Sequence, residues 1–143
     1  WDKAEQLAAT SAVMNDGEVV MPGGHLTVAQ LTAILNTLQL EIFFVDAENI
    51  NRYFNESPKV FKRPNMAIDR DVFSCHPPKV ETIVRGIINS FRAGTSDTVP
   101  VWMEKGGRPM LVTYMAVRDR DKNYLGTMEI VQDMSDAKAH FEK

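Results

Sequence analysis

One amphipathic helix constrains the fold of this chain more than any other feature. Apolar side chains recur at three- and four-residue spacing after Pro77-Pro78, which suits a first helical turn, and Gly94 is placed to end the helix. These apolar residues are Val80, Ile83, Val84, Ile87, Ile88 and Phe91. The pattern predicts a helix over 77–94 with one apolar face that must pack on another element.

Strand patterns precede and follow this helix. They are 40–46 and 50–54 before it, and 99–104, 110–118 and 124–132 after it. Residues 42–45 are apolar at consecutive positions, so the first of these strands needs cover on both faces. Gly106-Gly107 supplies the positive φ angles of a tight hairpin. We therefore predict an α+β fold, with a five-stranded antiparallel sheet and helices inserted between strands two and three.

The two ends of the chain carry weaker signals. Residues 1–25 have few strong apolar anchors, and we predict a linker or the end of a preceding segment there. Thr27 and Gln30 have the spacing of a capping box, which predicts the start of a helix. Its apolar stripe is Leu31, Ile34, Leu35 and Leu38. We expect this helix to cover one face of the sheet or to cross to a second copy of the chain. The predicted domain spans 26–136, and 137–143 begin a polar exit helix.

The composition excludes several function classes. The chain has 143 residues, of which 44% are hydrophobic, which indicates a single globular domain. Its net charge of −3 argues against a nucleic-acid module, because such a module needs a basic face. One cysteine forms no internal disulfide. The longest apolar run, 42–45, is too short for a bilayer, and the first residues show no signal peptide, so we expect a cytoplasmic domain without a membrane partner. The missing initiator methionine indicates a piece of a longer protein.

Several local motifs give this order of elements a family resemblance. Val45-Asp46 followed by Arg52-Tyr53-Phe54-Asn55 looks like the first hairpin of a PAS domain, the sensor module of bacterial signalling proteins. Asp133-Met134-Ser135 is similar to the Asp-aliphatic-Ser/Thr motif that ends the last PAS strand. Cys75-His76-Pro77-Pro78-Lys79 looks like the PAS module of a bacterial family in which the module accompanies a hemerythrin-like helical domain. Asp69 stands where we expect a glycine in that family.

The resemblance implies a PAS-like sensory module that forms a homodimer. Such a module binds a small apolar ligand or haem and relays a conformational shift to a linked domain, here a hemerythrin-like or other domain. We predict the ligand cavity between the long helix and the sheet. Its predicted lining is Val80, Ile83, Val84, Ile87, Phe43 or Phe44, Trp102, Met115 and Met128. Plain core packing is the alternative interpretation of these residues.

Cys75-His76 is the one pair with evident chemical potential. It lies just ahead of a helix N-terminus, where the helix dipole lowers a thiol pKa. The resemblance makes His76 a candidate haem ligand and metal residue, and Cys75 a neighbour that tunes the site. Alternatively, His76 only caps the helix and Cys75 is a small buried apolar residue, or Cys75 is an oxidisable thiol.

No pattern indicates an enzyme. The chain has no nucleophile elbow or phosphate loop, and His25, His76 and His140 lack zinc spacing. Three hypotheses stay open: a ligand-binding or haem-binding sensor, a ligand-free PAS dimerisation module, and a thiol redox sensor through Cys75.

Overall fold

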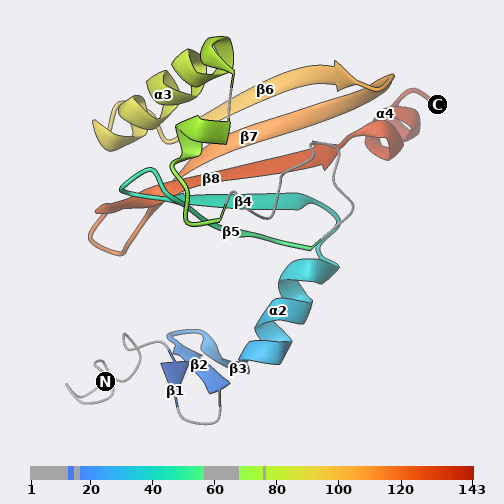
Figure 1. The fold of residues 1–143 in the computed structure, drawn as a ribbon. Helices are drawn as coiled ribbons and strands as arrows, with labels where there is room; N and C mark the ends of the chain where they lie inside the picture. Colours follow the sequence, from blue (N-terminus) through green and yellow to red (C-terminus); the bar gives the residue numbers. More distant parts are fainter. Residues whose placement is uncertain (1–12, 15–16, 57–67, 76) are drawn as a thin grey trace. The chain divides into compact units, whose positions relative to one another are not determined.

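The computed structural model describes residues 13–14, 17–56, 68–75 and 77–143 (Figure 1). The chain divides into two units, residues 1–38 and residues 39–143. The second unit holds the sheet, the long helix and the exit helix, and it carries the functional argument.

The first unit contains a small sheet followed by a helix. Its antiparallel strands are β1 (Val13–Met14), β2 (Glu18–Met21) and β3 (Gly24–Thr27), which precede α2 (Val28–Thr37). The sequence pattern predicted no strand within residues 1–25, whereas the structure forms β1, β2 and the start of β3 there. Pro22-Gly23 is the turn of the β2–β3 hairpin, with Met21 opposite Gly24, instead of a break between elements.

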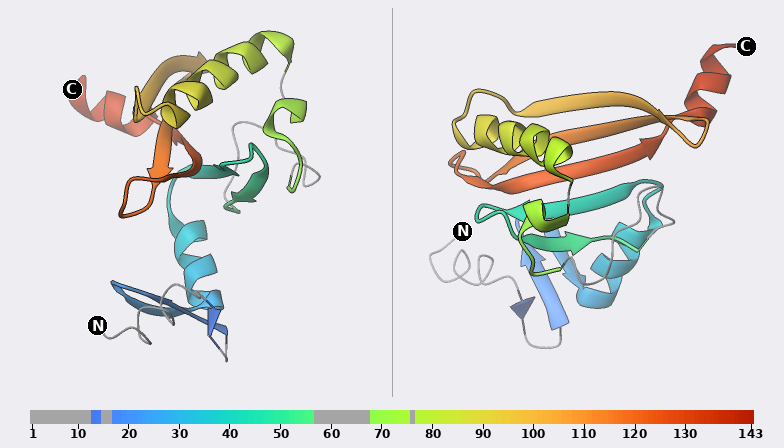
Figure 2. Two further views of the ribbon diagram at one scale, coloured as in Figure 1. Left: turned by 90° about the vertical axis from the view of Figure 1, so that its left-hand side faces the viewer. Right: turned by 45° about the horizontal axis from the view of Figure 1, so that its top comes forward.

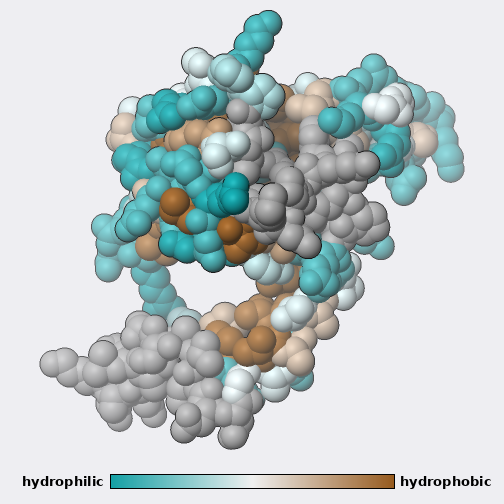
Figure 3. All heavy atoms as spheres, in the orientation of Figure 1, coloured by the Kyte–Doolittle hydropathy of each residue, from teal (hydrophilic) through white to brown (hydrophobic). Residues whose placement is uncertain are grey.

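The helix α2 begins as predicted. The backbone N–H of Gln30 donates to the Thr27 hydroxyl at 3.0 Å, and the backbone N–H of Thr27 donates to the Gln30 side chain at 3.0 Å. This reciprocal pair is a capping box. None of the α2 residues is buried, and Figure 3 shows apolar side chains gathered along it. Its role as cover for a sheet face stays a prediction.

The second unit confirms the predicted α+β fold. Its five antiparallel strands are ordered β5-β4-β8-β7-β6, and Figure 2 shows the long helix against one face of the sheet. The strands are β4 (Glu41–Asp46), β5 (Asn51–Phe54), β6 (Thr98–Lys105), β7 (Arg108–Arg118) and β8 (Tyr124–Asp133). The helical elements are η3 (Val72–Cys75) and α3 (Pro78–Arg92) between β5 and β6, and α4 (Ser135–Phe141) after β8.

Strand register separates the two faces of the sheet, because directly paired residues point to the same side. Phe43 pairs with Glu129, which pairs with Tyr114, and this side is the inner face. Phe44 pairs with Met128, which pairs with Met115, and this side is the outer face. The helix α3 packs on the inner face, where Val45 lies in one buried cluster with Val84, Ile88 and Val72.

The core lies between α3 and the inner face. A second buried cluster joins Phe43, Met110, Val112 and Val131. Phe91 is fully buried at the end of α3. Full burial of side chains of this size stabilises the fold by roughly 1.5–3 kcal/mol each.

A buried asparagine fastens the start of β4. Asn55 accepts a hydrogen bond from the Ile42 N–H at 2.9 Å and donates one to the Leu40 carbonyl at 2.9 Å. Its side chain therefore replaces a missing strand partner just after β5. This geometry explains why the aromatic-Asn step at 54–55 closes the first hairpin.

Candidate functional site

A small cavity lies on the inner face where β4, β5 and β8 meet η3. Its volume is about 30 Å³. The lining residues are Phe43, Val45, Asn51, Tyr53, Phe54, Val72 and Glu129. A space of this size holds roughly one water molecule.

The cavity lining combines apolar walls with a few polar groups. Phe43 and Phe54 form one wall, with ring centroids 6.3 Å apart. Of the polar lining residues, Asn51 pairs with Val45 and Glu129 with Phe43, both on the inner face, whereas Tyr53 pairs with Phe44 of the outer face. Burial, together with the negative charge of Glu56, raises the pKa of Tyr53 above its ordinary value. A mostly apolar enclosure with a few hydrogen-bonding groups is the usual composition of a small-molecule site.

The structure does not gather the predicted lining residues around one cavity. From α3, Val84 is buried and Ile87 is half-buried, but Val80 is 39% exposed and Ile83 63% exposed. Phe44, Met115 and Met128 belong to the outer face, as does Trp102, which is 68% exposed. The predicted set therefore mixes residues from both sides of the sheet.

The Cys75-His76 pair lies largely outside what the structure describes. His76 is not among the described residues, and Cys75 is placed only as the last residue of η3. The N-cap residue of α3 is Pro77, so neither Cys75 nor His76 occupies that position. Among the described residues, no cluster of three or more His, Cys, Asp or Glu side chains could hold a metal ion. The haem, metal and thiol roles of the pair remain predictions.

The cavity-lining residues that the sequence analysis missed are mainly on β5, η3 and β8. Asn51, Tyr53 and Phe54 come from β5, Val72 from η3 and Glu129 from β8. The alternation along β8 was the available signal, since Thr127, Glu129 and Val131 share the inner face. Because residues 42–45 of β4 are all apolar, the sequence does not show which alternate residues of this strand face the core.

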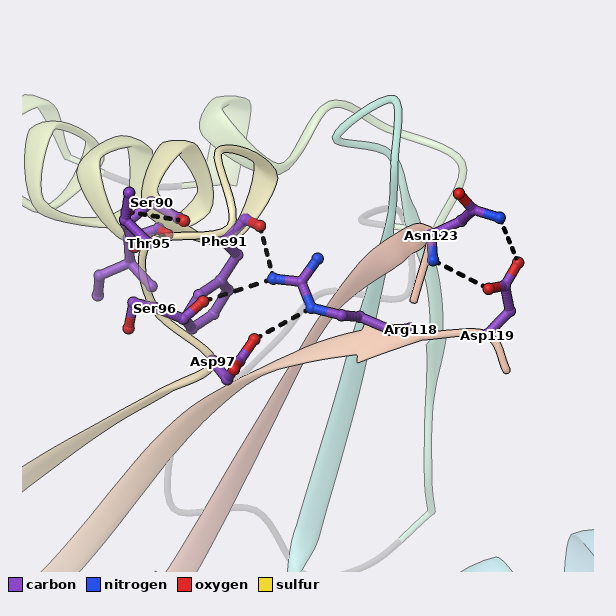
Figure 4. A network of polar contacts seen from close by, with 9 residues as sticks. Ser90, Phe91, Thr95, Ser96, Asp97, Arg118, Asp119 and Asn123 are labelled. Atoms are coloured by element: carbon purple, nitrogen blue, oxygen red, sulfur yellow. Dashed lines mark hydrogen bonds and ion pairs between the residues drawn. The ribbon is translucent and has the colours of Figure 1, made fainter. Parts of the chain in front are cut away.

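The far end of α3 is tied to the sheet by Arg118 (Figure 4). Its guanidinium donates to the Phe91 carbonyl at 2.7 Å and pairs with the Asp97 carboxylate at 3.0 Å. The bond to Phe91 satisfies a carbonyl in the last turn of α3, which a cation stabilises further. Arg118 is thus a C-terminal cap of α3 supplied by β7.

A second arginine extends this attachment to the turn between β4 and β5. Arg92 donates to the Asn49 side chain at 3.1 Å and lies over the ring of Tyr124, 5.1 Å from its centroid. Arg118 approaches the same ring at 6.0 Å. The end of α3 is therefore held against the β4–β5 turn, β7 and β8 at once.

The passage from β8 into α4 is fixed by Asp133. Its carboxylate accepts hydrogen bonds from the Ser135 N–H at 2.9 Å and from Arg108 at 2.9 Å. The Met134 N–H donates to the Pro109 carbonyl at 2.9 Å, so the helix start is also bound to the β6–β7 hairpin. The hydrogen bonds from Ser135, with the nearby charge of Arg108, hold the pKa of Asp133 below its ordinary value. We call Asp133, Met134, Ser135 and Arg108 the exit junction.

An exposed ion-pair network closes the β4–β5 hairpin. Arg52 lies 2.6 Å from Asp46 and 2.7 Å from Asp69. Partial burial raises the pKa of Asp46, but hydrogen bonds from Arg52 and from the Ile50 and Glu48 N–H groups outweigh it, and the net pKa is lowered. Asp69 has φ of 62°, a left-handed conformation that favours glycine, which fits the expectation of a glycine at this position.

Comparison with known families decides the identity. The family model described as PAS domain matches residues 31–135. The chain belongs to the PAS domain family. Comparison with curated proteins gives no match. No helix among the described residues is long and apolar enough to cross a membrane.

Solved structures place this PAS domain among related folds. It is 37% identical to the C-terminal domain of a Streptococcus mutans protein, with a TM-score of 0.81, covering 85% of this chain and 96% of that one. A PAS domain from Colwellia psychrerythraea is 15% identical, with a TM-score of 0.52, covering 76% and 98%. A sensory box sensor histidine kinase from Vibrio cholerae is 12% identical, with a TM-score of 0.51, covering 72% and 88%. The last two likenesses show the fold alone.

Proposed function

We propose that this PAS domain is a sensory module in which a small ligand enters the inner-face cavity and shifts the exit junction. The observation that carries the proposal is the course of β8. Glu129 lines the cavity, and Asp133, four residues further along the same strand, anchors the exit junction. Residues four apart on a strand lie on the same face, about 13 Å apart. One rigid element therefore connects the cavity with the start of α4.

The size of the cavity makes binding depend on movement. A ligand larger than water does not fit into about 30 Å³ without separating the walls. Such a ligand binds an opened arrangement better than the closed one, and this difference in affinity is what shifts a conformational equilibrium. We expect η3, which contributes Val72, to move away from the sheet, which contributes Phe43 and Glu129.

The lining favours a small, mostly apolar ligand with one hydrogen-bonding group. Phe43, Val45, Phe54 and Val72 are apolar, whereas Asn51, Tyr53 and Glu129 are polar. The described cavity does not fit haem, since a porphyrin is far larger than one water molecule and no histidine or cysteine is among the lining residues. A haem that binds through His76 is therefore an outcome that the experiment below must distinguish.

The relay ends at the exit junction. The Arg108–Asp133 contact and the Met134–Pro109 hydrogen bond couple the start of α4 to both β8 and the β6–β7 hairpin. A displacement of β8 relative to the hairpin must break or rearrange these contacts. The linked domain that receives the shift is, on the family resemblance, hemerythrin-like.

Native mass spectrometry of the chain purified from its own host tests ligand binding. The wild type should retain a small-molecule adduct, and Val72→Phe, which fills the cavity, should lose it. Ile83→Phe is the matched control, because Ile83 is 63% exposed on α3, and it should keep the adduct. An adduct that survives in Val72→Phe, or none in any variant, contradicts the proposal. A Soret band that His76→Ala abolishes would assign haem instead.

A ligand-free dimerisation module is the second candidate. The observation in its favour is the exposed apolar surface of α2, where Val28, Ile34 and Leu38 are 47%, 48% and 40% exposed. We propose that the chain forms a homodimer in either case, because exposed apolar stripes mark interaction surfaces. Sedimentation velocity on the wild type tests it, and a single monomer species at tens of micromolar, as an order of magnitude, would contradict it.

A further inference from the structure

An apolar groove lies between the β6–β7 hairpin and the exit helix. Its volume is about 610 Å³, and we call it the exit groove. The lining residues that matter here are Trp102, Glu104, Met110, Met134, Lys138 and Phe141. The groove belongs to neither the inner-face cavity nor α2.

Two large aromatic side chains at this groove are exposed to solvent. Trp102 is 68% exposed on β6, and Phe141 is 83% exposed on α4. Exposed Trp and Phe side chains beside a concave apolar surface are typical of protein–protein contacts. Met110 on the floor is buried and Met134 is half-buried, and methionine side chains adapt readily to an inserted ring.

The walls of the groove are fixed before any partner arrives. Arg108 at the start of β7 binds Asp133 at the end of β8 at 2.9 Å, and the Met134 N–H donates to the Pro109 carbonyl at 2.9 Å. These contacts hold α4 at a set distance from β6 and β7. A preformed surface loses little conformational entropy on binding.

The charges identify the occupant. The two charged side chains that line the groove have opposite signs and stand on opposite walls, Glu104 on β6 and Lys138 on α4. Lys138 contacts Glu142 only at 4.0 Å, an exposed pair that contributes little and is readily exchanged. The surface therefore carries a protruding side chain, Phe141, beside a groove that can receive it, and it carries both an anion and a cation. Such a surface is complementary to a second copy of itself, which is what a two-fold contact requires.

We propose that the exit groove is a two-fold contact between two copies of this chain. Phe141 of each copy inserts into the groove of the other, and Glu104 of each copy pairs with Lys138 of the other. The contact brings the two exit helices side by side, so that a shift at either exit junction acts on both. This contact needs no ligand, since all the residues that form it are already in place in the exit groove.

Sedimentation velocity of charge-reversed variants tests this contact. Glu104→Lys and Lys138→Glu should each weaken self-association at least tenfold, because each places like charges opposite each other twice. An equimolar mixture of the two should dimerise again, since the mixed dimer restores both ion pairs. Lys122→Glu, in the exposed β7–β8 turn, is the matched control and should associate like the wild type.

The outcomes separate this inference from the others. Unchanged association of both reversed variants and of Phe141→Ser overturns it, and so does a mixture that stays monomeric. A wild type that is monomeric at all tested concentrations overturns it as well. Loss of association only on Leu38→Glu would place the dimer contact on α2 instead. None of these results alters the ligand test with Val72→Phe, so the failure of one proposal is distinguishable from that of the other.

Discussion

Gly126 is the glycine at which adding a Cβ atom, as in Gly126→Ala, should lower the unfolding free energy the most. It lies on β8 opposite Asp46 of β4 and Val117 of β7. A Cβ at this position would lie 2.1 Å from the Val45 carbonyl oxygen and 2.8 Å from the Phe44 ring. The first neighbour is backbone in the central strand pair, so the clash is relieved only by moving β4 and β8 apart.

The expected loss on Gly126→Ala is roughly 3 kcal/mol of unfolding free energy. Overpacking of a close-packed site costs about 1–3 kcal/mol, and a disfavoured backbone conformation, here φ of 158°, adds about 1–2 kcal/mol. Urea denaturation followed by circular dichroism measures the change. The melting temperature should fall by roughly 6–12 °C.

Two other glycines serve as matched controls for the same substitution. Gly107 has φ of 76° but no atom within 4 Å of an added Cβ, so Gly107→Ala should cost only about 1–2 kcal/mol. Gly86 lies in α3 with open space around it, so Gly86→Ala should stabilise by about 0.5–1 kcal/mol. A Gly126→Ala variant within 1 kcal/mol of the wild type would refute the argument from close approach.

Three further predictions concern named polar contacts. Arg118→Ala should lower the unfolding free energy by about 1.5–3 kcal/mol in urea denaturation, with Arg118→Lys recovering only part, because the guanidinium bonds to the Phe91 carbonyl and to the Asp97 carboxylate are lost together. Asn55→Ala should cost about 2–3 kcal/mol in the same assay, since it removes the side-chain hydrogen bonds to the buried Ile42 N–H and to the half-buried Leu40 carbonyl; a cost below 0.5 kcal/mol would contradict this. The pKa of Asp133 is lowered in the folded state, so its ionised carboxylate stabilises the fold. This contribution to stability is complete above the unfolded-state pKa of about 3.9 and is lost as the pH falls through the folded-state pKa. The Ser135 amide shift in NMR should therefore titrate only below about pH 4, and Asp133→Asn should remove that transition.

The sequence predicted which segments form helices and strands better than it predicted which face of each strand lies in the core. The stripe of α3 placed Val84, Ile88 and Phe91 in the core, as observed, because a 3.6-residue period identifies one side of a helix. In β4, four consecutive apolar residues carry no such information. The outer-face Phe44 and the inner-face Phe43 are equivalent in the sequence, and only pairing with Glu129 or Met128 separates them.

The predicted cavity lining mixes both faces of the sheet for the same reason. Trp102, Met115 and Met128 are large apolar residues on strands, and nothing local shows which side of the sheet meets α3. The polar cavity residues Asn51 and Glu129 were missed because an apolar cavity was expected. The hairpin over 18–27 was missed because Pro22-Gly23 fits a break between elements as well as it fits a hairpin turn.

Hydrogen exchange at the exit junction tests the central claim most directly. Val72→Phe forces the cavity walls apart as a bound ligand would, whereas Ile83→Phe adds the same ring on the exposed side of α3. Amide exchange of Met134 and Ser135, measured against core amides of β7, should change at least threefold in Val72→Phe and stay unchanged in Ile83→Phe. Equal exchange at both amides in all three proteins would show that the cavity and α4 are not coupled, and it would contradict a sensory role for this PAS domain.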